Sequence, residues 1–170
     1  MNSETEALIL ELAEMLKARG WMCATAESCT GGLIAKRITD VPGSSAVLLG
    51  GLVTYTNEVK TALLGVPVSL IERETEVSHA CACAMAVGAR ERLDADLAVS
   101  TTGFAGPGGG TERDPVGTVY IAVATREGVV GERFSAPENA TRRGVREAAA
   151  ARALELLLSA AVALSKTKHT

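Results

Sequence analysis

Residues 21–38 read WMCATAESCTGGLIAKRI, and this stretch decides the fold class. Its first part, residues 21–27, is a short apolar run that predicts a buried strand. Gly31 and Gly32 then interrupt the run, and apolar side chains recur at helical spacing from Leu33 onward. A strand that leads directly into a helix is the repeating unit of α/β proteins, so the stretch predicts that class.

The alternation of helices and strands continues on both sides of this stretch. Further strands are predicted at residues 46–56, 97–102, 117–124 and 129–135, the last two as a β-hairpin. Further helices are predicted from Ser3 to Gly20, from Asn57 to Leu64, over residues 79–92 and over residues 140–164. This order predicts a single three-layer α/β/α domain with a mixed sheet over residues 1–165, and a frayed tail at residues 166–170.

Local signals add detail at the element ends. Asn57 is expected to cap a short helix, and Ser69 with Glu72 predicts a capping box for the next one. Gly50 and Gly51, inside a predicted strand, indicate a β-bulge or a close approach of another backbone.

Composition excludes several functional classes. The chain has 170 residues, 47% hydrophobic and 22% charged, which is typical of one globular domain rather than of a disordered chain. Its 17 Lys and Arg against 20 Asp and Glu argue against a general nucleic-acid binder, because such binding depends on cations. Aromatic residues make up only 3%, which argues against a platform for stacking single strands.

The cysteines, histidines and apolar runs predict no metal site, cofactor or membrane span. The four cysteines match neither zinc-ligand spacing nor a C-x-x-C motif, and Cys81 and Cys83 are expected to be small buried side chains. His79 and His169 have no partner suited to a metal site. No run of 18 uninterrupted apolar residues occurs, and the N-terminus is acidic, so we expect a cytoplasmic protein without membrane contact.

The first candidate site is the turn at residues 27–32, Glu-Ser-Cys-Thr-Gly-Gly. A helix N-terminus offers unpaired N–H groups to an oxyanion or a phosphate, and open α/β sheets bind ligands at the carboxyl ends of their strands. We therefore expect Ser28 to be exposed at a ligand site. The alternative is that Ser28 or Thr30 only caps the helix.

The second candidate is residues 51–60, GLVTYTNEVK, with Tyr55 at a strand end and Lys60 in the first turn of a helix. A cation near a helix N-terminus opposes the helix dipole, so a surface role is disfavoured. A lysine kept neutral beside a serine can act as its general base, if burial lowers its pKa from about 10.4 to about 7–8. The alternative is an ordinary solvated lysine.

The third candidate is the glycine-rich run at residues 103–111, GFAGPGGGT. It matches neither a P-loop nor a dinucleotide-binding fingerprint. Its density of glycine favours close backbone approach to a ligand, or tight turning in a plain connecting loop. Thr101 and Thr102 end the preceding strand and are expected to face the same sheet edge as Ser28.

Three arginines, Arg142, Arg143 and Arg146, open the last predicted helix. Cations at a helix start are electrostatically disfavoured, so a phosphate or a partner chain would explain them. The alternative is a solvated helix face.

Together, AESCTGG at residues 26–32, GLVTYTNEVK at 51–60, STTGFAGPGGGT at 100–111 and PVGTV at 115–119 closely resemble one family. It is the CinA C-terminal domain family, whose stand-alone members are nicotinamide-nucleotide amidases (PncC). The resemblance covers nearly the whole chain. It implies a three-layer α/β/α fold, commonly a homodimer, that converts nicotinamide mononucleotide to nicotinate mononucleotide and ammonia in NAD salvage.

The resemblance also implies roles for single residues. The family's functional positions fall on Ser28, Tyr55, Lys60, Thr102, Arg142 and Arg146. Ser28 would attack the carboxamide carbon, Lys60 would act as base and then as acid, and Tyr55 would orient or relay.

The expected oxyanion donors are N–H groups near Thr30 and Gly31, with the Thr102 hydroxyl as a further donor. The loop at residues 106–111 and Arg142 would hold the phosphate and ribose. The expected substrate-binding residues are Thr30, Gly31, Gly32, Gly106, Gly108, Gly109, Gly110, Thr111 and Arg142.

Two departures from the family pattern concern substrate contacts. Asp114 stands where the family often has Lys, and Ala140 with Thr141 stands where Gly-Asp is usual. Three alternatives to the serine amidase stay open: Cys29 as the nucleophile, an amidase of a related nucleotide amide, and a nucleotide-binding or interaction module without turnover.

Overall fold

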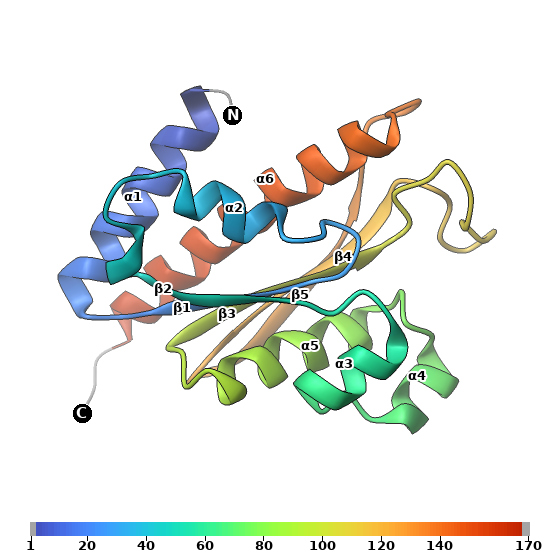
Figure 1. Cartoon of the computed structure of the whole chain (residues 1–170), viewed down its shortest axis with the longest axis horizontal. Helices are drawn as coiled ribbons and strands as arrows, with labels where there is room; N and C mark the ends of the chain where they lie inside the picture. Colours follow the sequence, from blue (N-terminus) through green and yellow to red (C-terminus); the bar gives the residue numbers. More distant parts are fainter. Residues whose placement is uncertain (1–2, 168–170) are drawn as a thin grey trace.

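The strand–turn–helix unit predicted at residues 21–38 is present as β1 (Cys23–Glu27) and α2 (Leu33–Thr39) in a computed structural model that describes residues 3–167 (Figure 1). The other strands are β2 (Leu48–Val53), β3 (Leu97–Gly103), β4 (Thr118–Thr125) and β5 (Gly128–Ser135). The other helices are α1 (Ser3–Arg19), α3 (Asn57–Leu64), α4 (Val68–Glu74), α5 (His79–Arg92) and α6 (Arg142–Lys166), with a 3₁₀ turn, η1, at Ser44–Ala46.

The five strands form one mixed sheet in the order β2-β1-β3-β4-β5. β1 runs parallel to both β2 and β3, whereas the β4–β5 hairpin is antiparallel. Glu27, the last residue of β1, pairs with Val53 of β2 and Thr101 of β3. The carboxyl ends of the three parallel strands therefore meet at one edge, where α/β sheets bind their ligands.

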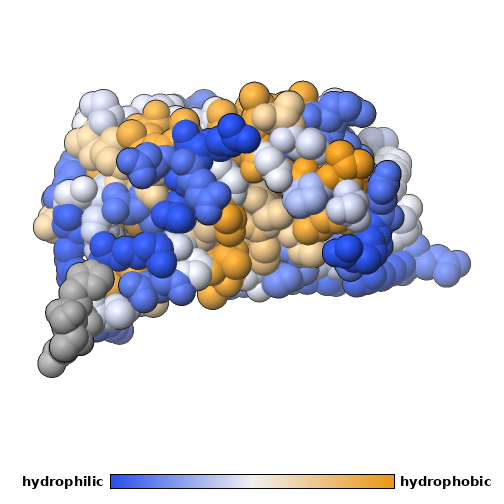
Figure 2. Space-filling view, turned by 90° about the horizontal axis from the view of Figure 1, so that it is seen from below, coloured by the Kyte–Doolittle hydropathy of each residue, from blue (hydrophilic) through white to orange (hydrophobic). Residues whose placement is uncertain are grey.

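Helices cover both faces of the sheet, which confirms the predicted three-layer α/β/α architecture. Figure 1 shows α1, α2 and α6 on one face and α3, α4 and α5 on the other. The small side chains of α5 allow close packing, and a Cβ at Gly88 would lie only 2.0 Å from the carbonyl oxygen of Leu64. Figure 2, seen from the α3–α5 side, shows apolar patches between charged side chains; Leu63 and Val68 are exposed apolar residues of α3 and α4.

Two of the predicted caps are wrong. Thr56, and not Asn57, caps α3, because its extended backbone lets its hydroxyl accept a hydrogen bond from the Val59 N–H at 3.4 Å. α4 begins after Pro67, which has no N–H to satisfy, so Ser69 lies inside the helix and forms no capping box.

The β-bulge or close approach predicted at Gly50 and Gly51 is confirmed in β2. The β1–β2 register shifts between Cys23 and Ala24, which leaves a bulge before Gly50. A Cβ at Gly51 would lie 2.7 Å from the Thr25 hydroxyl and 2.8 Å from the Ala35 Cβ. Glycine is therefore needed where α2 crosses the sheet.

α6 continues further than predicted, to Lys166, so the frayed tail does not begin at residue 166. Residues 168–170, with His169, lie outside the described residues. By length and composition alone α6 is long and apolar enough to cross a membrane, although it contains no run of 18 uninterrupted apolar residues. Its side chains Val145, Leu154 and Leu157 are buried in the core between α6 and the sheet, as in the core helix of a globular domain.

Candidate active site

A cleft of about 190 Å³ opens at the carboxyl ends of β1, β2 and β3. It brings together residues from five separate parts of the chain. Residues predicted as functional that line it are Ser28, Tyr55, Lys60, Thr102 and Arg142.

The centre of the cleft is a contact between Ser28 and Lys60. The Lys60 Nζ donates a hydrogen bond to the Ser28 Oγ at 3.2 Å. Lys60 is 1% exposed and lies on α3, which packs against α5, so it is not a solvated surface lysine. Ser28 is 8% exposed, and the expectation that it would be openly exposed is wrong: it lies at the bottom of the cleft.

Burial governs the protonation of this pair. It lowers the pKa of Lys60, and the neighbouring thiol of Cys81 and carboxylate of Glu76 oppose this effect only in part. A lysine with a lowered pKa can be neutral and accept the serine proton. By contrast, burial raises the pKa of the Cys29 thiol to about 12, so Cys29 is a poor source of thiolate near neutral pH.

The N-terminus of α2 is capped by Glu27, a role that the sequence analysis missed. The fully buried carboxylate accepts hydrogen bonds from the N–H groups of Gly32 at 3.0 Å, Ile34 at 3.1 Å and Ala35 at 2.9 Å. The Thr25 hydroxyl donates a fourth, at 3.2 Å. An acidic residue directly before two glycines and an apolar run was the available signal, but Glu is not among the usual N-cap residues.

This cap changes the expected roles of the turn. The N–H of Gly31 donates to the Ser28 carbonyl at 3.1 Å, and that of Gly32 to Glu27, so neither is free for an oxyanion or a phosphate. The Thr30 hydroxyl bonds to that of Thr101 at 2.7 Å and caps nothing. In this structure the N–H groups of Gly31 and Gly32 are therefore not available as the ligand donors expected at the start of α2.

The arginines of α6 have protein partners. Arg146 donates to the carbonyls of Cys29 at 3.1 Å and Thr30 at 2.7 Å, and so holds the turn that follows Ser28. These hydrogen bonds explain the position of Arg146 without a bound phosphate. Arg142 donates to the Gly106 carbonyl at 2.6 Å and to the Tyr55 hydroxyl at 3.0 Å, beside the cleft.

The hydroxyl groups of Tyr55 and Thr102 also have hydrogen-bond partners in the protein. Tyr55 is 57% exposed and bonds to Arg142, and its hydroxyl has no direct hydrogen bond to Ser28 or Lys60 within the described chain. The Thr102 hydroxyl donates to the Glu76 carbonyl at 2.6 Å. Because its proton is used there, Thr102 is not a free oxyanion donor.

The glycine-rich loop mainly forms a tight turn. Gly106 has a φ of 80°, and a Cβ at Gly110 would lie 2.4 Å from the Val116 nitrogen. Residues 108–111 are exposed and do not line the cleft, so Gly108, Gly109, Gly110 and Thr111 make no part of its wall.

Both departures from the family pattern have structural roles. The buried carboxylate of Asp114 accepts hydrogen bonds from the Tyr120 hydroxyl at 2.9 Å and the Arg133 Nε at 3.0 Å, which anchors the loop to β4 and β5. Thr141 caps α6 by accepting a hydrogen bond from the Gly144 N–H at 3.1 Å.

Replacing Glu27 by Gln is expected to lower the free energy of unfolding by about 3 kcal/mol, because the new NH₂ group would face backbone donors and leave them unsatisfied. Urea unfolding measures this. Glu11→Gln on the exposed face of α1 is the control and is expected to leave stability unchanged. Equal midpoints for both variants would contradict the capping role.

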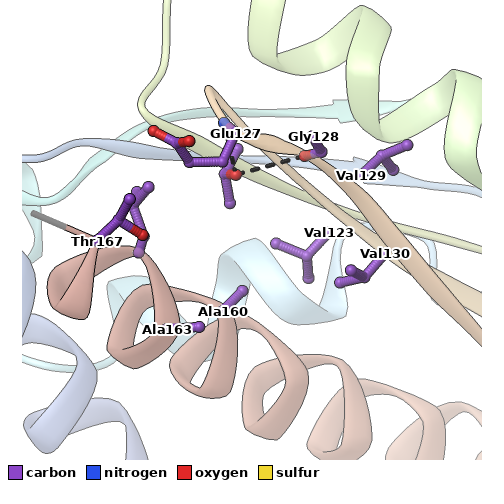
Figure 3. A pocket seen from close by; sticks show the side chains of 10 residues that line it. Val123, Glu127, Gly128, Val129, Val130, Ala160, Ala163 and Thr167 are labelled. Carbon is purple, nitrogen blue, oxygen red and sulfur yellow. Dashed lines mark hydrogen bonds between the residues drawn. The ribbon is translucent and has the colours of Figure 1, made fainter. Parts of the chain in front are cut away.

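A second cavity, of about 300 Å³, lies between the β4–β5 hairpin and the C-terminal half of α6. In Figure 3 the side chains of Val123 and Val130 point toward Ala160 and Ala163 of the helix. Among the described residues that line it, Glu127 is the only ionisable one. The cavity lacks the nucleophile and base that the cleft at Ser28 contains, so the cleft is the candidate active site.

Comparison with known proteins gives a consistent result. A sequence profile of the CinA C-terminal domain matches residues 5–161. A "CinA-like protein" of Geobacter sulfurreducens is 53% identical over 133 residues, 77% of this chain and 32% of that protein. A "CinA-like protein" of Desulfotalea psychrophila is 49% identical over 146 residues, 86% of this chain and 35% of that protein.

Among solved structures, the competence/damage inducible protein CihA from Agrobacterium tumefaciens has a TM-score of 0.90 at 41% identity. The match covers 94% of this chain and 96% of that chain. The chain spans about a third of the length of the curated relatives described above.

Proposed function

This chain belongs to the CinA C-terminal domain family, and we propose that it is an amidase that converts nicotinamide mononucleotide to nicotinate mononucleotide and ammonia. The observation that carries the proposal is the hydrogen bond between the buried Lys60 amine and the Ser28 hydroxyl inside a cleft. A binding module has no need of a nucleophile paired with a base.

In the proposed reaction, neutral Lys60 takes the hydroxyl proton of Ser28 as its Oγ bonds to the carboxamide carbon. The tetrahedral intermediate then loses ammonia, which takes a proton from Lys60, and an ester on Ser28 remains. Water attacks this ester with Lys60 again as base, and the acid product leaves as Ser28 recovers its proton. The scheme uses no metal or cofactor.

We assign the oxyanion to the N–H of Cys29 instead of those near Thr30 and Gly31. Cys29 directly follows the nucleophile and lines the cleft, whereas the Gly31 N–H is occupied. The Ser28 N–H is also occupied, by the Thr101 carbonyl at 2.9 Å.

The mouth of the cleft suits a ring with an anionic group. Tyr55 and Phe104 line it with aromatic surface, and Arg142 supplies a cation beside them. Guanidinium groups bind phosphate through paired hydrogen bonds, so we assign the phosphate to Arg142. The protein is proposed to act in the cytoplasm as a homodimer.

Replacing Arg142 by Ala is expected to lower kcat/KM for nicotinamide mononucleotide roughly 10- to 100-fold, mainly through KM, because a phosphate contact is lost. Arg143→Ala is the matched control, since the Arg143 side chain is 88% exposed and faces Glu147. Urea unfolding of both variants excludes a general loss of structure. An unchanged KM for Arg142→Ala would remove Arg142 from the substrate site.

The test of the function is ammonia release from nicotinamide mononucleotide by the purified protein without added metal. Release above the uncatalysed rate supports the amidase. No release, with nucleotide binding still seen by calorimetry, would replace the amidase by a binding module. Release only from another pyridine or nucleotide amide would move the proposal to that substrate.

A further inference from the structure

One acidic side chain lines the cleft without a part in the reaction scheme. Glu76 lies in the loop between α4 and α5 and is partly buried. Within residues 3–167, its carboxylate takes part in no ion pair and no hydrogen bond. An unpaired carboxylate on the wall of a cleft is available to a ligand.

The backbone around Glu76 is held firmly in place. The Thr102 hydroxyl donates to the Glu76 carbonyl at 2.6 Å, the Ser78 hydroxyl to the Thr75 carbonyl at 3.0 Å, and the Thr75 hydroxyl to the Val77 carbonyl at 3.1 Å. Thr75 has a φ of 70°, which is strained for a β-branched residue. Strain of this kind persists where the surroundings enforce it, and it clusters at ligand sites.

The charge of Glu76 reaches the reacting groups. It raises the pKa of Lys60, against the effect of burial, and it also raises the pKa of the Cys81 thiol. Glu76 and Lys60 both line the cleft that Ser28 enters from β1. A carboxamide bound in this cleft with its carbon at Ser28 can therefore present its nitrogen to the wall that Glu76 and Lys60 share.

The substrate and the product of the proposed reaction differ at the position of this nitrogen. A carboxamide offers two N–H donors, whereas the acid product carries a negative charge and no donor. We propose that Glu76 selects a carboxamide over a carboxylate in this cleft, by accepting a hydrogen bond from the amide nitrogen and repelling the acid. The inference rests on the proposed amidase function and adds the residue that distinguishes substrate from product.

Binding, not turnover, tests the proposal. Calorimetric titration with nicotinamide mononucleotide and with nicotinate mononucleotide is carried out on the full chain carrying Ser28→Ala, which cannot complete the reaction. The same titrations are repeated with Glu76→Gln added, which keeps the shape of the side chain and removes its charge. Glu72→Gln in the same background is the control, since Glu72 is exposed on α4 and lines a different groove.

With Glu76 present, the amide is expected to bind roughly 10-fold or more tightly than the acid, because a like charge in a cleft is strongly disfavoured. Glu76→Gln should bring the two dissociation constants to within about 3-fold of each other, whereas Glu72→Gln should not. An unchanged ratio in Glu76→Gln, or absence of binding by both nucleotides, would overturn the proposal. Ammonia release by the unchanged protein decides the amidase function separately, so the two failures are distinguishable.

Discussion

Ser28→Ala is expected to lower the rate of ammonia release from nicotinamide mononucleotide by at least about 10³-fold, as loss of a nucleophile usually does. Without the Ser28 Oγ the acyl-enzyme ester of the proposed reaction cannot form. Folding should be little affected, because within residues 3–167 the side chain makes one hydrogen bond, with Lys60. Initial rates at saturating substrate measure the effect, and circular dichroism checks the fold.

Cys29→Ala is the matched control, one residue along the same turn. Its thiol is 6% exposed and burial raises its pKa to about 12, so activity should be retained in this variant and after thiol alkylation. Wild-type turnover in Ser28→Ala, or loss of turnover only in Cys29→Ala, would transfer the nucleophile to another residue.

Lys60→Met is expected to lower kcat about 10²- to 10⁴-fold, because the general base is lost while the apolar stem of the side chain is kept. The pH profile provides the specific readout. Since burial lowers the pKa of Lys60, kcat/KM of the unchanged protein should rise with pH through a pKa below the ordinary value of 10.5. The residual activity of Lys60→Met should lack this rise.

The lowered pKa of Lys60 also predicts a dependence of stability on pH. Between the lowered value in the folded state and the ordinary value of 10.5, the unfolded chain binds more protons than the folded protein. The free energy of unfolding therefore rises with pH across that window, and this contribution is at its lowest below the folded-state pKa. Lys60→Met should remove the rise, which urea midpoints at several pH values would show.

Lys36→Met is the control for both measurements, because Lys36 lies on the surface of α2 and pairs with Asp40 at 2.6 Å. It should keep the activity and both pH dependences of the unchanged protein. If Lys60→Met kept the wild-type rate and its pH profile, Lys60 would not be the base.

The fold could be predicted largely from local pattern. The strand and helix periodicity around residues 21–38 and the hairpin near Gly128 depend on neighbours in the chain, and they are present. The resemblance to the CinA C-terminal domain family, now confirmed, rests on the same contiguous motifs. The caps at Asn57 and Ser69 were wrong because Thr56 and Pro67, one or two positions earlier, satisfy the helix starts better.

The site was less predictable because its supporting contacts are long-range. Lys60 and Ser28 are 32 residues apart, and no local pattern in the sequence shows that they are in contact. The contact of Arg146 with Cys29 spans 117 residues and has no periodicity that a sequence could record. Asp114, which differs from the family pattern, anchors its loop by accepting a hydrogen bond from Arg133 of β5, 19 residues further along the chain.

Arg146, which holds the turn after Ser28, lies on α6 and is therefore synthesised after the residues that it positions. Ser28 and Lys60 leave the ribosome long before the helix that fixes the nucleophile turn and supplies Arg142 to the mouth of the cleft. A nascent chain that has not yet added α6 contains Ser28 and Lys60 but lacks the Arg146 hydrogen bonds to the Cys29 and Thr30 carbonyls. For the proposed amidase, catalysis therefore becomes possible only after α6 has been synthesised and has packed against the turn that follows Ser28.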